Sequence, residues 1–117
     1  MAENLKFQGT HGINTVPTAP ASPASGDPVR VGKACGVAVN AKDGNGNTVV
    51  DFGPSVYALS VKGIDGSGNS AVAVGDELFY TDGDTPPVSK KATGTHIGFA
   101  LATVGSSLTA TVNVLVK

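Results

Sequence analysis

The chain has 117 residues, which is enough for one domain with one hydrophobic core. Only 15% of the residues are charged and the formal net charge is −1, so the sequence lacks the basic excess that binds nucleic acid or an anionic membrane. No segment is long and apolar enough to span a bilayer. Residues 1–4 lack the basic and apolar pattern of a secretory signal, so we expect a protein that is made in a cytosol and stays soluble.

Residues 1–25 differ in composition from the rest of the chain. Isolated apolar side chains stand among Gly, Thr, Asn, Ala and Pro; they are Leu5, Phe7, Ile13 and Val16. Three prolines then follow at three-residue spacing, a pattern that favours an extended path without regular ladder hydrogen bonds. Two interpretations stay open. The segment is either a terminus without a role or an arm that becomes ordered on a partner and uses the four apolar side chains as anchors.

We expect ordered structure to begin at Gly26 and to consist of short strands joined by turns rich in Gly, Asp and Asn. The predicted strands are residues 29–31, 36–39, 48–52, 56–61, 77–80, 96–101 and 108–116. The last of them alternates apolar and polar residues, which is typical of a half-buried strand central to the fold. Leu115 interrupts its polar face, so this strand is expected to end buried on both sides or against a partner chain.

No window has the 3.6-residue apolar spacing of a helix. The sequence therefore predicts an all-β fold, a small β-barrel or sandwich of short strands, with an extended N-terminal arm over residues 1–25 and a β-barrel domain over 26–117. A weak internal repeat is present: a Gly-Asp pair precedes a Gly-hydrophobe-Ala strand twice, at residues 26–38 and 75–100. Two related hairpins facing each other across one barrel would produce it, and so would chance. The turn at residues 82–87 is expected to protrude into solvent.

Reaction chemistry has little support in the sequence. Cys35 stands among small apolar residues, as a buried thiol does, and His11 and His96 lack any metal-binding or hydrolase motif around them. Two loops beginning at Asp43 and Asp65 copy part of a calcium-binding loop, but a hairpin turn needs the same residue types. We therefore expect no catalytic residues, no cofactor and no metal.

From Gly26 onward, an ordered set of short motifs resembles the phage capsid cement, or decoration, proteins. The motifs are Gly26-Asp27-Pro28-Val29-Arg30-Val31-Gly32, Gly36-Val37-Ala38, Gly75-Asp76-Glu77-Leu78-Phe79-Tyr80-Thr81-Asp82, Gly98-Phe99-Ala100-Leu101-Ala102 and the closing hydrophobic strand. The resemblance implies a structural virion protein on the outer capsid surface, assembled in the host cytoplasm and commonly trimeric. Such a protein bridges neighbouring subunits of the major capsid protein and has no catalytic residues.

On this interpretation the arm is the capsid-binding element, and its anchors are Leu5, Phe7, Ile13 and Val16. Two other classes remain. A β-barrel module for carbohydrate binding or host-surface adhesion is disfavoured because the chain has no Trp and only two Tyr to stack on sugar rings. A small hydrolase is disfavoured because no nucleophile and base stand in a recognisable motif.

Overall fold

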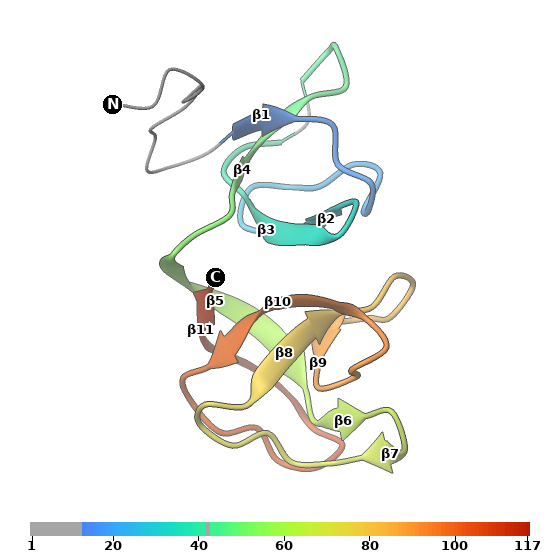
Figure 1. Ribbon diagram of the computed structural model, residues 1–117, viewed down its shortest axis with the longest axis vertical. Coiled ribbons are helices and arrows are strands. Elements are labelled where there is room, and N and C mark those ends of the chain that lie inside the picture. The colour runs from blue at the N-terminus through green and yellow to red at the C-terminus, as the bar shows by residue number, and fades with distance from the viewer. Residues whose placement is uncertain (1–12, 42) are drawn as a thin grey trace, which may run out of the picture.

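Figure 1 presents the computed structural model, which describes residues 13–41 and 43–117 and forms two β-structured units stacked one on the other. In the first unit the strands lie in the order β1-β4-β3-β2, and all neighbours are antiparallel. Its strands are β1 (Ile13–Thr15), β2 (Pro28–Val31), β3 (Ala34–Ala38) and β4 (Thr48–Asp51). Gly53 turns the chain at a positive φ of 85° between β4 and the second unit.

The second unit is a closed barrel in which the strands follow the order β10-β11-β5-β9-β8. Its strands are β5 (Ser55–Lys62), β8 (Glu77–Tyr80), β9 (Val88–Ser89), β10 (Thr95–Ala100) and β11 (Thr109–Val116). A small hairpin of β6 (Ile64–Asp65) and β7 (Gly68–Asn69) extends from the end of β5. The expected all-β fold with a small barrel is confirmed, and the described residues contain no helix.

The barrel interior holds the larger of two hydrophobic clusters, with Leu78, Ile97 and Val114 fully buried. Cys35 and Val37 of β3 belong to this same cluster. The side of the first unit that carries them therefore packs against the barrel and extends its core. The smaller cluster lies within the first unit and is made of Val29, Ala38 and Val50, with Val31 and Phe52 packed against it.

Strand β11 lies between β10 and β5 in the barrel and pairs with β5 along its whole length, from Thr109 to Val116. Val114 and Val116 are buried, whereas Thr109, Thr111 and Asn113 are exposed. Leu115 points to the outer side with these polar residues and is half-buried. Before β8, Val72 pairs with Val104 in a single antiparallel bridge.

The expectation that ordered structure starts at Gly26 is wrong, because β1 precedes it at Ile13–Thr15. β1 pairs with β4 over three residues, and the chain then crosses to the other edge of the sheet, where Ala19 forms a bridge with Arg30. The backbone N–H groups of Thr18 and Ala19 both donate to the Arg30 carbonyl, at 2.7 and 3.1 Å. A proline removes only its own N–H, so the residues between Pro17 and Pro20 can still pair with a strand.

The residue 82–87 turn packs against the first unit through Asp82 and does not simply protrude into solvent. The chain after it forms β9, whose Val88 and Ser89 are buried and close the barrel between β5 and β8. The neighbouring Lys90 and Lys91 lie 3.5 and 2.8 Å from the carboxylates of Asp76 and Asp84.

The internal repeat is present in the structure. Gly26 and Gly75 have φ values of 89° and 90°, and their N–H groups donate to the carbonyls of Ala38 and Ala100, both at 2.7 Å. The pairing registers make β1, β2, β3 and β4 the counterparts of β5, β8, β10 and β11. The two hairpins therefore belong to two repeated units. Two hairpins facing each other across one barrel, one of the two explanations that the sequence left open, are not what the structure has.

Candidate functional site

Of the four expected capsid anchors, Leu5 and Phe7 lie outside the described residues. Ile13 is 46% exposed and belongs to β1, whose only partner among the described strands is β4. Val16 is 60% exposed and follows β1 directly. These two apolar side chains lie beside a strand edge, which is a surface on which another chain can add a strand.

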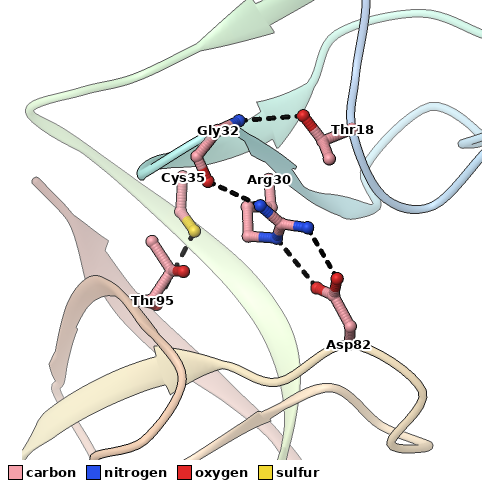
Figure 2. Close-up of polar contacts among 6 residues, drawn as sticks. All are labelled: Thr18, Arg30, Gly32, Cys35, Asp82 and Thr95. Atoms are coloured by element: carbon pink, nitrogen blue, oxygen red, sulfur yellow. Dashed lines mark hydrogen bonds and ion pairs between the residues drawn. The ribbon is translucent and has the colours of Figure 1, made fainter.

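A polar junction joins the first unit to the barrel (Figure 2). Arg30 of β2 donates from Nε and Nη2 to the two carboxylate oxygens of Asp82, at 2.9 and 2.6 Å. Its Nη1 donates to the carbonyl of Gly32 at 2.7 Å, and the N–H of Gly32 donates to Thr18 Oγ1 at 2.9 Å. The hydrogen bonding between Arg30 and Asp82 lowers the pKa of the Asp82 carboxyl and raises the pKa of the Arg30 guanidinium.

Cys35 lies beside this pair and points towards the barrel (Figure 2). Its Sγ is 3.6 Å from the carbonyl of Thr95 at the start of β10. Burial raises the pKa of the thiol to about 12, so the thiol stays protonated at neutral pH. The prediction that Cys35 is a buried, packed residue is therefore confirmed.

Asp51 is the second polar contact between the units, and it is only 2% exposed. Its carboxylate accepts hydrogen bonds from Ser55 Oγ at 2.8 Å, Tyr57 Oη at 2.7 Å and the Gly53 N–H at 2.8 Å. Burial and the hydrogen bond to Asp51 raise the pKa of Tyr57. The last residue of β4 thus holds the first residues of β5 and orients the barrel on the first unit.

The outer side of the barrel carries an apolar surface, which we call the barrel outer face. It consists of Phe79, His96, Phe99, Leu115 and Val56, which are neighbours through the pairing of four strands. The His96 ring makes edge-to-face contacts with both phenylalanine rings, at centroid distances of 5.6 and 5.3 Å. His96 Nε2 lies 3.6 Å from Glu77 Oε2. The aromatic packing explains why this histidine is half-buried at a strand start.

The two loops that copy part of a calcium site use their carboxylates for turns. Asp43 accepts from the N–H groups of Asn45 and Asn47 at 2.8 and 2.9 Å, and Asp65 accepts from that of Ser67 at 2.8 Å. Within residues 13–41 and 43–117, no three His, Cys, Asp or Glu side chains gather as metal ligands would. That same part of the chain has no helix long and apolar enough to cross a membrane.

An open cleft of about 380 Å³ lies where the two units meet. Its lining includes Pro20 and Pro28 from the first unit and Tyr80, Thr85 and Pro87 from the barrel. Burial raises the pKa of Tyr80, so its phenol is neutral there. The cleft follows from the way in which the units pack.

The contacts of Arg30, Asp51 and Asp82 were not predicted from the sequence. A signal was present in the sequence: Arg30 is a lone charge inside a Val-rich strand, and Asp51 ends another apolar run. Such charges within strands need partners. The partner of Arg30 is 52 positions away in the chain, so sequence spacing could not identify it.

The comparisons with known proteins agree with the earlier resemblance. A family model described as phage cement protein matches residues 7–116. No curated protein and no solved structure matches the chain. The match begins at residue 7 and so includes most of the segment that was expected to be an arm. Because this match covers nearly the whole chain, the protein belongs to the phage cement proteins, structural components of the virion that associate with the phage capsid.

Proposed function

We propose that this protein binds the outer surface of a phage head and stabilises the shell by bridging neighbouring subunits of the major capsid protein. The observation that carries the proposal is the family match over residues 7–116. In the virion the protein would act as a homotrimer, as the resemblance implies for this kind of protein. Bridging is a mechanical task, so it calls for a stable fold and at least two adhesive surfaces.

The geometry supports this task in two ways. The Arg30–Asp82 pair and the hydrogen bonds of Asp51 fix the two units to each other, so force applied to one is transmitted to the other. Ile13 and Val16 present apolar surface beside the edge of β1 that pairs with none of the described strands. We assign capsid binding to residues 1–16, with Leu5, Phe7, Ile13 and Val16 as anchors, and we expect a capsid segment to pair along this edge.

The test uses purified heads that lack this protein. We would measure the affinity of the intact chain for heads and the temperature at which decorated heads release their DNA. The variants are a deletion of residues 2–12 and the double substitution Ile13→Thr with Val16→Thr, which keeps side chains suited to a strand. Val39→Thr is the matched control, because Val39 lies in the same unit and is 47% exposed, close to the 46% of Ile13.

We expect both arm variants to lose at least tenfold in affinity, and the heads mixed with them to release DNA at the temperature of undecorated heads. The control should bind as the intact chain does. Unchanged affinity of both arm variants would overturn the arm as the docking element. Binding of the intact chain without any rise in the release temperature would overturn the stabilising role.

A further inference from the structure

The repeat makes the outward side of each unit comparable, residue by residue. Arg30 pairs with Cys35 across β2 and β3, as Phe79 pairs with His96 across β8 and β10. Val37 pairs with Asp51, as Phe99 pairs with Leu115. A bulge at Ile97 is the one irregularity in this register. The correspondences are Arg30 with Phe79, Cys35 with His96, Val37 with Phe99, and Asp51 with Leu115.

In the first unit, all four outward positions contact the barrel. Arg30 binds Asp82, and Asp51 binds the hydroxyls of Ser55 and Tyr57. Cys35 and Val37 belong to the hydrophobic cluster of the barrel itself. The outward side of the first unit is therefore an interface, and what it contacts is another unit of the same strand framework.

In the barrel, the four corresponding positions remain accessible and are more apolar. Phe79, Phe99 and Leu115 are half-buried, and the His96 side chain is 36% exposed. Val56, which pairs with Leu115 at the far end of the row, is 54% exposed. The polar residues of the same side, Thr111 and Asn113, lie further along β11. A contiguous aromatic and aliphatic surface of this kind is typical of a protein contact.

We propose that the barrel outer face is the contact between copies of this chain. Its occupant is a second copy, because the corresponding side of the first unit is already covered by a unit of the same framework. The surface also suits association with a second copy because Glu77, whose side chain is 61% exposed, places a hydrogen-bond acceptor at its rim. This inference rests on the proposed function for its setting, since it gives the surface of the proposed homotrimer.

The test needs no phage heads, so its failure is distinct from failure of the proposed function. Sedimentation velocity is measured on the full chain over a range of micromolar concentrations, for the intact protein and for Phe99→Ser with Leu115→Ser. The control is Val74→Ser with Leu108→Ser, which removes apolar side chains that are 63% and 60% exposed elsewhere in the barrel unit. Circular dichroism and thermal unfolding check that all of them fold.

A second readout uses the substitution Val56→Cys. The native Cys35 is buried and its thiol pKa is about 12, so a maleimide reagent at neutral pH should label position 56 alone. We expect the intact and control proteins to be oligomers and the Phe99/Leu115 variant to be a monomer. Labelling at position 56 should be at least tenfold slower in the oligomer than in the monomeric variant.

Three outcomes would overturn the proposal. The first is an intact protein that is monomeric at every concentration measured, which would show that the surface does not join copies of this chain. The second is an oligomer that persists in the folded Phe99/Leu115 variant. The third is a monomer in which deleting residues 2–12 speeds labelling at position 56, which would assign the surface to the chain's own N-terminal residues.

Discussion

Arg30 and Asp82 lie 52 positions apart in the chain and meet in a two-pronged ion pair that joins the first unit to the barrel. In the repeat, Arg30 of the first unit corresponds to Phe79 of the barrel. The same position therefore makes a polar contact in one unit and belongs to an apolar surface in the other. This contrast separates the contact within the chain from the contact proposed between chains.

Asp82→Asn should lower the melting temperature at neutral pH, because the amide keeps the shape but loses the charge that Arg30 binds. The pKa of Asp82 is lowered in the folded protein, so its stabilising effect is present above the ordinary value of 3.8 and is lost as the pH falls through the folded pKa. The difference in melting temperature between the two proteins should therefore shrink in acid. Asp43→Asn is the control, since an amide oxygen can still accept the turn hydrogen bonds there. A difference that stays constant down to a pH of about 2 would contradict the assignment.

Asp51→Ala should cost about 3 kcal/mol of unfolding free energy, because it leaves Ser55, Tyr57 and the Gly53 N–H without their acceptor. Tyr57→Phe removes one of these hydrogen bonds and no acceptor, so it should cost about 1 kcal/mol. Urea unfolding measures both. Equal costs for the two substitutions would show that the carboxylate does not organise the junction.

The strands and the all-β fold were predictable because each strand repeats a local pattern between turn residues. Residues 108–116 are the clearest case, since their alternation predicted the strand and its buried side. Only Leu108 differs, because it precedes β11 and is 60% exposed. β9 was not predictable, because a strand of two residues, Val88 and Ser89, is too short to show an alternating pattern. Its position in the barrel is set by its pairing with β5 and β8.

The candidate surfaces divide in the same way. Leu115 already stood out as an apolar residue on a polar side, so a contact at this end of β11 was expected from the sequence. Its neighbours Phe79, His96 and Phe99 come from other strands, and they could be placed beside it only once the pairing register was known. Non-local pairing is the information that local patterns lack.

In alkaline solution the protein should lose stability, and Cys35 should be the main cause. Burial raises its pKa from 9.0 to about 12, so the neutral thiol is favoured in the folded state. The stabilisation is complete below pH 9.0 and is lost progressively as the pH rises towards about 12. Melting curves of Cys35→Ala over this window should depend less on pH than those of the intact chain. Parallel curves for the two proteins would point to Tyr57 and Tyr80, whose pKa values are also raised.

Val114→Asp should prevent folding or cost several kcal/mol, since it places an unpaired charge in the barrel interior at a fully buried position. Asn113→Asp, one residue earlier and exposed on the other side of β11, should change the unfolding free energy by less than about 0.5 kcal/mol. Circular dichroism and urea unfolding compare the two. A folded, stable Val114→Asp protein would contradict the assignment of this side of β11 to the core.

Gly98→Ala tests the close approach of β10 to β11 and, with Gly36→Ala, the repeat. A Cβ atom at Gly98 would collide with the carbonyl oxygen of Leu115, and one at Gly36 would collide with that of Asp51, the corresponding residue. Each substitution should cost about 3 kcal/mol, because the backbone of the paired strand must shift to make room. Gly66→Ala, where nothing lies within 4 Å, should be neutral or slightly stabilising. Urea unfolding of the three variants gives the comparison. Similar losses at Gly36 and Gly98 are expected if the two units use one framework, and a loss at only one of them would show that the likeness does not extend to strand packing.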